Sequence, residues 1–226
     1  MFVALDDDGN QRLAWHLVGT IPTPEMRCPE CEEGVFLKAG AIKVPHFSHY
    51  PGSTCSFGSG EGARHLLLKS HVFKAFEAFD GVDYERSVIQ GRRADLAIPA
   101  HCLAVEAQVS PMHQDEWLSR TAAYSDKDWH VLWVWDRDRV GGLESLAYIP
   151  REIRLCHRAS YGHLTAVTDE GEFYAVNLQP HPYRRGGWRR VLYKHLVDDV
   201  YLNHMENDGL KLVSLQRGAW WKAWVS

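Results

Sequence analysis

The segment Arg92–Ser110 reads RRADLAIPAHCLAVEAQVS, and two of its stretches are apolar enough to form strands. We expect the first strand at Ala94–Ile98 and the second at Leu103–Val109, with Pro99–Cys102 forming the turn between them. Because successive side chains of a strand point to opposite faces, the alternate apolar residues of the second strand share one face. This hairpin is the stretch around which we expect the rest of the chain to be organised.

Acidic residues interrupt both strands of the hairpin. Glu106 and Gln108 project together from one face of the second strand, and Asp95 lies in the first. Carboxylates in otherwise apolar sequence are costly to bury unless something binds them. Carboxylate oxygens suit Mg²⁺ or Mn²⁺, so Asp95 and Glu106 predict a site for a divalent cation. The alternative is a hairpin whose acids face solvent.

The spacing of Asp95, Glu106 and Gln108 resembles the D…(D/E)-x-K core of the PD-(D/E)xK nucleases. In those enzymes the two acids hold the metal and the lysine helps to activate water. Gln108 stands in the position of that lysine. An amide can orient a water molecule but carries no positive charge. Two functions are therefore open: a nuclease, and a catalytically weak or inactive nuclease-fold module that binds DNA or a protein partner.

Composition sets the broad class of the protein. The 226 residues are 45% hydrophobic and 12% aromatic, which suffices for one domain of ordinary size plus a small module, or for two small domains. The formal net charge of −4 does not favour bulk nucleic-acid binding, although a local basic face can still bind DNA. We see no signal peptide and no apolar run long enough to cross a membrane, so we expect a cytoplasmic protein with no membrane association.

Cysteine and histidine residues cluster between positions 26 and 57. Cys28 and Cys31 form a CxxC pair, the usual first half of a zinc ribbon. The second half must come from His46, His49 and Cys55, which is one ligand more than a tetrahedral site takes. We expect Cys28, Cys31, His49 and Cys55 to bind a structural Zn²⁺, with His46 replacing one of them as the alternative. A redox pair would also explain CxxC, but no thioredoxin-like pattern surrounds it.

An apolar stripe predicts a helix over Gly60–Phe79, with Ser59 as its N-cap. Glu61 and His65 lie on this stripe one turn apart, so a carboxylate and an imidazole point inward just before the acidic hairpin. We expect them to serve as ligands of a metal or of water. The alternative for His65 is a histidine packed into the core.

The segments that flank the hairpin predict further strands and a second helix. Residues 83–89 predict a strand. Ser110 and Pro111 predict the start of a helix that ends near Ser125. The apolar segment His130–Trp135 predicts a buried central strand, and a strand–helix–strand crossover predicts that it runs parallel to the second hairpin strand. The resulting order is αβββαβ.

The αβββαβ order is similar to the core of the PD-(D/E)xK fold, and a succession of short motifs makes the resemblance specific. The motifs are CPEC, PHFSH, a following cysteine, E-x3-H-x3-K, RxD, E-x-Q-x-S and R-x3-Y. In this order, over roughly residues 25–136, they resemble the competence protein CoiA-like family. In that family a small zinc-ribbon-like N-terminal module precedes a nuclease domain of restriction-endonuclease type.

The resemblance implies a role for each matching residue. The residues that it places at the catalytic centre are Asp95, Glu106, Gln108, Glu61 and His65. Those that it places against nucleic acid are Lys69, Arg93, Arg120 and Tyr124. Asp95 and Glu106 become ligands of Mg²⁺ or Mn²⁺, and the family itself tends to show Gln at position 108. The implied function is a metal-dependent DNA nuclease that handles foreign or incoming DNA.

We therefore expect an α/β fold of three parts. Residues 1–57 form an N-terminal hairpin and the zinc-ribbon-like module, 58–140 the restriction-endonuclease-like core, and 141–226 an α+β extension. In the extension, Leu164–Val176 predicts a strand pair and Leu192–Met205 predicts a helix.

Basic and aromatic residues give the extension two further candidate surfaces. The first is the segment YRRGGWRR, whose candidate nucleic-acid-binding residues are Arg184, Arg185, Trp188 and Arg189. A solvated arginine-rich turn is its alternative. The second is the C-terminal group Trp220, Trp221 and Trp224, which either packs on the core or forms a surface for self-association or a protein partner. A zinc-stabilised regulatory or defence component that binds a protein through this group is a third functional hypothesis.

Overall fold

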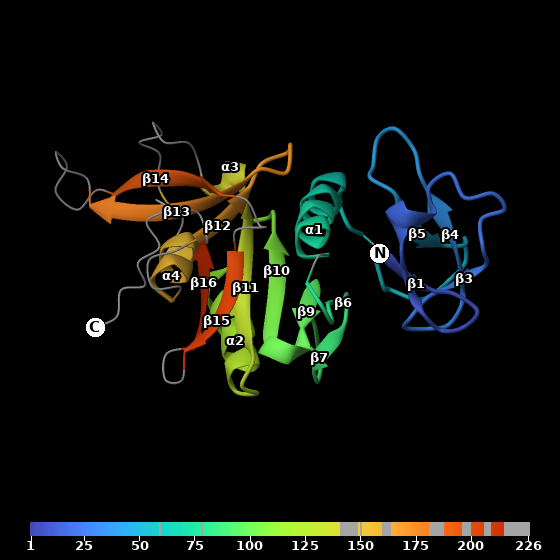
Figure 1. The fold of residues 1–226 in the computed structure, drawn as a ribbon, viewed down its shortest axis with the longest axis horizontal. Helices are drawn as coiled ribbons and strands as arrows, with labels where there is room; N and C mark the ends of the chain where they lie inside the picture. Colours follow the sequence, from blue (N-terminus) through green and yellow to red (C-terminus); the bar gives the residue numbers. More distant parts are fainter. Residues whose placement is uncertain are drawn as a thin grey trace. The chain divides into compact units, whose positions relative to one another are not determined.

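The chain divides into two compact units, Met1–Ser70 and His71–Ser226, and the boundary falls inside helix α1 (Ala63–Phe76) (Figure 1). The structure is a computed structural model. It describes residues 1–58, 60–77, 79–140, 149, 151–159, 164–180, 188–195, 200–205 and 209–214.

The first unit is built on a five-stranded sheet with strand order β2-β1-β3-β4-β5. The strands are β1 (Val3–Leu5), β2 (Gln11–Leu13), β3 (Met26–Arg27), β4 (Gly34–Lys38) and β5 (His46–His49). A short 3-10 helix, Ala14–Leu17, follows β2. Buried Phe2 and Phe47 form part of the core, and Phe2 meets Trp15 edge to face with ring centroids 5.5 Å apart. A sheet this small has a limited core of its own, which makes an added crosslink such as a metal valuable.

The second unit is built on a seven-stranded mixed sheet with strand order β14-β13-β12-β11-β10-β9-β6. Its strands are β6 (Asp83–Tyr84), β9 (Leu96–Ile98), β10 (Leu103–Gln108), β11 (His130–Asp136), β12 (Leu164–Val167), β13 (Phe173–Pro180) and β14 (Trp188–His195). Two separate strand pairs are β7 (Ser87–Ile89) with β8 (Arg92–Arg93), and β15 (Val200–Met205) with β16 (Gly209–Ser214). Its helices, besides the end of α1, are α2 (Gln114–Ser125), α3 (Arg137–Val140) and α4 (Arg151–Ala159).

The structure confirms the central hairpin and the crossover that follows it. β9 and β10 pair antiparallel, with Ile98 opposite Leu103, and a 3-10 turn at Pro99–His101 joins them. β10 and β11 pair parallel, with Glu106 beside Trp133, and α2 forms the connection between them. β11 lies between β10 and β12, which explains why its sequence is apolar on both faces.

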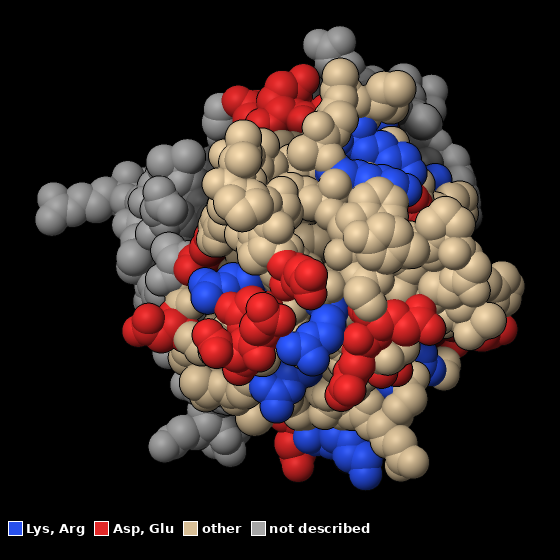
Figure 2. All heavy atoms as spheres, turned by 90° about the vertical axis from the view of Figure 1, so that its right-hand side faces the viewer, with Lys and Arg blue, Asp and Glu red and all other residues tan. Residues whose placement is uncertain are grey.

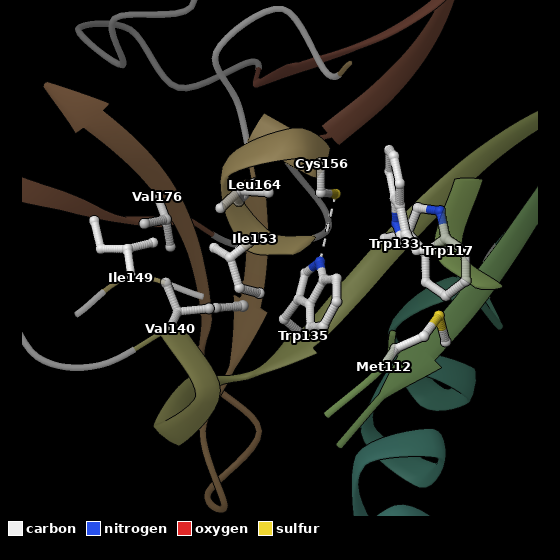
Figure 3. Packing of buried hydrophobic residues seen from close by; sticks show 11 residues of the cluster. Met112, Trp117, Trp133, Trp135, Val140, Ile149, Ile153, Cys156, Leu164 and Val176 are labelled. Carbon is white, nitrogen blue, oxygen red and sulfur yellow. Dashed lines mark hydrogen bonds between the residues drawn. The ribbon is translucent and has the colours of Figure 1, made fainter. Parts of the chain in front are cut away.

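An aromatic core covers one face of β11 and ties the helices to the sheet (Figure 3). Trp133 and Trp135 are two residues apart on the strand, so they share this face, and their ring centroids lie 6.2 Å apart. The indole Nε1 of Trp133 donates to Thr121 Oγ1 of α2 at 3.2 Å, and that of Trp135 donates to Cys156 Sγ of α4 at 3.4 Å. Each buried indole therefore contributes packing area and also fixes one helix in place.

Helix boundaries differ from the sequence predictions. The first helix is shorter than expected, because α1 covers only Ala63–Phe76. The second begins at Gln114 rather than beside Ser110, and its N-cap is His113, whose ring nitrogen accepts from the Asp115 amide at 3.4 Å. Side-chain capping can start a helix at several polar residues, and here a later residue makes the cap.

Strand predictions were partly wrong. The predicted strand 83–89 breaks at Glu85, whose φ of 49° is left-handed, so its two halves become β6 and β7 in different sheets. Asp95 lies directly before β9 rather than within a strand. The helix predicted over Leu192–Met205 is absent, because residues up to His195 continue β14 and pair with β13, and β15 covers Val200–Met205. Pairing with a neighbouring strand outweighed the four-residue spacing of apolar side chains.

Other features of the C-terminal half agree with expectation or lie outside the described residues. The predicted strand pair is confirmed as antiparallel β12 and β13, with Leu164 opposite Val176. The structure places the backbone of Trp188 and Arg189 in β14. The predicted site residues that lie outside the described part of the chain are Arg184, Arg185, Trp220, Trp221 and Trp224. Among the described helices, none is long and apolar enough to cross a lipid bilayer.

Candidate functional site

Asp95 and Glu106 come together at the start of β9 and in the middle of β10. The Oδ2 atom of Asp95 accepts a hydrogen bond of 2.9 Å from the amide of Ala107, the residue after Glu106. The carbonyl of Asp95 accepts from the amide of Glu85 at 2.8 Å, which fixes the backbone at this position. The antiparallel pairing of β9 with β10 thus places two carboxylates, eleven residues apart in sequence, at one point of the sheet.

Glu106 is buried, with only 3% of its surface exposed, and both of its carboxylate oxygens have a partner. The phenol of Tyr124 donates to Oε1 at 2.6 Å, and Nη2 of Arg120 donates to Oε2 at 2.7 Å. Arg120 and Tyr124 lie one turn apart on α2, so one face of the helix supplies both contacts. Charge-assisted bonds of this length are the strong kind, which explains how a carboxylate is tolerated inside the unit.

Burial raises the pKa of Glu106 to about 7, and the neighbouring charge of Asp95 acts in the same direction. Arg120 and the hydrogen bond from Tyr124 oppose this shift. Burial, and then the charge of Glu106, also raise the pKa of Tyr124, so its phenol stays protonated as a donor. A cation beside the two acids would favour their ionised forms, and the electrostatics of the pair are therefore suited to binding one.

Small side chains on the same sheet face make room for the ring of Tyr124. Ala97 of β9 lies opposite Ala104 of β10, and both pack in one buried cluster with Ala94 and Tyr124. A larger residue at any of these alanines would push the phenol away from Glu106. The alanines of the quoted segment thus have a structural purpose that the sequence alone did not reveal.

Gln108 ends β10 two residues beyond Glu106, on the same face of the strand. Its side-chain amide donates to the carbonyl of Ser110 at 2.7 Å. The bond fixes the amide group and leaves its oxygen available as an acceptor. Gln108 therefore adds an oriented polar group near the acids, and no positive charge.

The predicted residues of the first helix form their own cluster in the first unit. Nζ of Lys69 lies 2.7 Å from Oε1 of Glu61, and Nδ1 of His65 lies 3.6 Å from the same oxygen. Lys69 is buried, so the ion pair with Glu61 compensates its charge. The structure brings Glu61, His65 and Lys69 together, and their place in one catalytic centre with Asp95 stays a prediction.

A second cluster in the first unit can hold a metal ion. One ligand atom each from Cys28, Cys31, His49 and Cys55 lies within 4.8 Å of the others. Sγ of Cys31 is 3.3 Å from Nε2 of His49. Tetrahedral zinc with bonds of about 2.3 Å to sulfur would separate its ligands by about 3.7 Å, so the four atoms are already close to that arrangement.

The local backbone and the thiol chemistry fit the same conclusion. The Glu30 amide points to Sγ of Cys28 at 3.4 Å, and the Glu32 amide closes the turn onto the Cys28 carbonyl at 3.0 Å. Desolvation raises the pKa of Cys31 to about 11, with the Cys55 and Cys28 thiols acting in the same direction. Thiols crowded in this way become thiolate ligands when a cation neutralises them.

His46, the alternative zinc ligand, lies outside this cluster. Its Nδ1 donates to the carbonyl of Val44 at 2.8 Å, and burial lowers its pKa. The residue is buried as part of β5. The structure thus selects the set with His49 and Cys55, and leaves His46 a packing role.

Charged residues on the surface are mixed in sign. On the face drawn in Figure 2, Lys and Arg side chains lie among Asp and Glu side chains, so the described residues form no continuous basic area there. Arg93 of β8 is half-buried, and its predicted contact with nucleic acid stays a prediction. The formal net charge of −4 gives no bulk attraction to DNA, so we expect any affinity for DNA to depend on a local site.

Family models match the two segments of the chain that contain these clusters. A family model described as Competence protein CoiA, N-terminal domain, matches residues 23–58, and one described as Competence protein CoiA, nuclease-like domain, matches residues 61–160. The chain belongs to the CoiA family. The predicted family resemblance is confirmed, and the CoiA N-terminal match contains all four residues of the cysteine and histidine cluster. The CoiA nuclease-like match contains Asp95, Glu106, Arg120 and Tyr124.

One curated relative shows how much of a CoiA protein this chain represents. Competence protein CoiA of Bacillus subtilis (strain 168) is 26% identical over 144 residues, which cover 59% of this chain and 39% of that protein. The chain therefore spans well under half of the length of this relative. No solved structure matches the chain.

Sequence analysis found the acids but missed what surrounds them. Arg120 and Tyr124 were predicted to contact nucleic acid, and their contacts with Glu106 were not foreseen. The available signal was the four-residue spacing of the two side chains on the helix that connects β10 to β11. A crossover helix must lie against the sheet, so its inward polar residues face whatever polar residue the strand presents.

Proposed function

We propose that this CoiA-family chain is a metal-dependent nuclease that hydrolyses phosphodiester bonds in DNA. The observation that carries the proposal is the position of Asp95, directly before β9 and bonded to the Ala107 amide, beside buried Glu106 of β10, within the segment that matches a nuclease-like domain. The arrangement of α1, β9, β10, α2 and β11 supports a PD-(D/E)xK core. By analogy with its competence-protein relative, the DNA would be foreign or incoming.

The chemistry of the two acids fits Mg²⁺ or Mn²⁺. Magnesium is commonly bound through one or two carboxylates, with water and substrate phosphate completing its coordination. Asp95 and Glu106 would hold it, because each oxygen of Glu106 accepts one hydrogen bond and keeps a second lone pair. When bound, such an ion lowers the pKa of a water molecule and neutralises charge on the scissile phosphate.

The chain's own residues would perform the remaining tasks. Gln108, fixed through Ser110, would orient the attacking water by accepting a hydrogen bond at its amide oxygen. Arg120 keeps the charge of Glu106 compensated before substrate arrives. Glu61 and His65, which lie together in the first unit, are proposed to assist as acid or base.

A structural Zn²⁺ is proposed for Cys28, Cys31, His49 and Cys55. The spacing of the ligand atoms and the donor set of three sulfurs and one nitrogen support zinc. The ion would crosslink a small sheet whose strands are two to five residues long. Its contribution would be to folding rather than to hydrolysis.

The test is cleavage of linear, circular and single-stranded DNA with Mn²⁺, with Mg²⁺ and with neither. Asp95→Asn is the informative variant, because asparagine still accepts the Ala107 hydrogen bond that alanine would leave unsatisfied. Asp115→Asn, which changes an exposed acid of the same unit, is the matched control. We expect metal-dependent cleavage in the parent and the control, and none in Asp95→Asn. Equal cleavage by parent and Asp95→Asn would refute this mechanism.

A second candidate is a module that binds DNA without cutting it. Gln108, which cannot supply the positive charge of the usual lysine, is the observation that favours it. Salt-dependent DNA binding by folded, zinc-loaded protein, with no product under any metal condition, would establish this function in place of cleavage.

A further inference from the structure

Two polar side chains of helix α2 point to β10, and both donate hydrogen bonds to the carboxylate of Glu106. Arg120 and Tyr124 approach Oε2 and Oε1 of Glu106 at 2.7 Å and 2.6 Å. A carboxylate with one donor on each oxygen cannot rotate about its last bond without breaking a hydrogen bond. The plane of the Glu106 carboxylate is therefore fixed by α2.

The burial of these two side chains argues that their purpose is internal. Tyr124 is 0% exposed, and its ring is enclosed by Ala94, Ala97 and Ala104. The side chain of Arg120 is 22% exposed, and its guanidinium lies over the ring of Trp133 at 5.3 Å. A phenol enclosed in this way cannot reach a phosphate or a base of bound nucleic acid.

The helix that carries the two donors is itself anchored to the sheet. Thr121, between Arg120 and Tyr124, accepts a hydrogen bond from the indole of Trp133, the strand neighbour of Glu106. Trp117, one turn earlier, packs on Trp133 with ring centroids 6.2 Å apart. The donors and the acceptor therefore sit on elements that cannot shift independently.

We propose that Arg120 and Tyr124 are positioning residues for Glu106, which hold its carboxylate in one orientation and leave a lone pair on each oxygen for a divalent cation. The inference rests on the proposed function only in taking Glu106 as a metal ligand. Partners that orient a ligand typically account for about 10- to 100-fold in metal affinity or activity. Their loss should therefore act on metal binding, with no direct effect on the DNA contact.

The experiment measures Mn²⁺ binding without DNA, from the resonance signal of free Mn²⁺, in zinc-loaded protein. Tyr124→Phe removes the donor and keeps the ring among its alanines. Tyr84→Phe, which removes another buried phenol of the same unit, is the matched control. Mn²⁺ that is bound by the parent and not by Asp95→Asn is assigned to the site at Asp95 and Glu106. This comparison distinguishes it from Mn²⁺ bound elsewhere on the protein.

We expect Tyr124→Phe to weaken Mn²⁺ binding by about 10-fold or more, and Tyr84→Phe to leave it unchanged. Arg120→Lys should retain more of the affinity than Arg120→Met, because lysine keeps a charged donor. DNA binding and its salt dependence should be the same in Tyr124→Phe as in the parent. Unchanged Mn²⁺ affinity in Tyr124→Phe, or weaker DNA binding with unchanged Mn²⁺ affinity, would overturn the assignment.

The same measurements separate the two proposals. If the parent binds Mn²⁺ at Asp95 but cuts no DNA, and Tyr124→Phe weakens that binding, the positioning role stands and the nuclease proposal fails. If the parent cuts DNA and Tyr124→Phe needs no more Mn²⁺ than the parent, the nuclease stands and the positioning role fails. A parent that binds no Mn²⁺ at this site overturns both.

Discussion

Replacing Glu106 by glutamine should remove a pH-dependent loss of stability from the second unit. Burial raises the pKa of Glu106 from an ordinary value of 4.5 to about 7, so the folded state binds this proton more tightly than the unfolded state does. The stability that the proton contributes is complete below the unfolded pKa and is lost as the pH rises through the folded one. The affected window runs from about pH 4.5 to about pH 7.

The size of the effect follows from the width of that window. Each pKa unit corresponds to about 1.4 kcal/mol, so a shift of this size corresponds to about 3 kcal/mol of unfolding free energy. Glutamine leaves Arg120 without its counter-ion, which adds a cost that does not depend on pH in this range. That cost cancels when the change in unfolding free energy between two pH values is compared between the parent and the variant.

The assay is urea unfolding followed by tryptophan fluorescence, at about pH 5 and about pH 8, with no added divalent cation. Trp117, Trp133 and Trp135 lie in one core and report the second unit. We expect the parent to lose about 2 to 3 kcal/mol more than Glu106→Gln between the two pH values, because pH 5 already lies inside the window. Glu116→Gln, an exposed change on the same helix, should behave as the parent. Parallel pH profiles for parent and Glu106→Gln would refute the reasoning.

Stabilisation by added Mn²⁺ should have the opposite pH dependence. Carboxylates bind metal in their ionised form, so Mn²⁺ should stabilise the parent more at about pH 8 than at about pH 5. Glu106→Gln should gain little stability at either pH, because the variant has lost one of the two proposed ligands. A gain of the same size in parent and variant would mean that Mn²⁺ binds elsewhere.

Three further outcomes are expected. Gly171→Ala should lower the unfolding free energy, measured in urea, by at least about 1 kcal/mol. The backbone of Gly171 has a φ of +83°, and an added Cβ would lie 2.6 Å from Nδ1 of His71. The His71 ring is held in place by a hydrogen bond between its Nε2 and the Asp169 carbonyl. Cys55→Ser should reduce bound zinc from about one ion per chain to almost none by metal analysis, and should expose the first unit to proteolysis. Gln108→Ala should lower the maximal cleavage rate about 10- to 100-fold with unchanged Mn²⁺ half-saturation, since its amide orients water and not the cation.

Elements whose contacts are local in sequence could be predicted, and the central hairpin is the clearest case. The predicted strand Leu103–Val109 and the turn at Pro99–Cys102 carry their own pairing information, because antiparallel neighbours follow each other along the chain. The members of the cysteine and histidine cluster could be predicted for the same reason, since CxxC fixes two of them locally. The sequence left open whether His46 replaces His49 or Cys55. That choice needed the pairing register of β4 with β5, which the spacing of residues in the sequence does not supply.

Elements decided by hydrogen-bond partners outside the segment could not be predicted. Leu192–Met205 has a helical spacing of apolar residues, yet β13 offers an open edge and β14 pairs with it along eight residues. Glu85 interrupts a segment that reads as a strand, because its backbone turns left-handed to give its amide to the Asp95 carbonyl. In both cases a hydrogen-bond partner outside the segment outweighed the preference of the segment itself.

The catalytic proposal and the stability of the core depend on the same helix. One face of α2 gives Arg120 and Tyr124 to Glu106, and Thr121 and Trp117 of that helix contact Trp133. Because parallel pairing sets Trp133 beside Glu106, any repacking of the aromatic core moves the two donors relative to the carboxylate. Core variants such as Trp117→Leu are therefore expected to weaken Mn²⁺ binding even though they lie outside the site. Because packing of α2 fixes the orientation of the Glu106 carboxylate, that carboxylate would need little reorganisation to bind a cation.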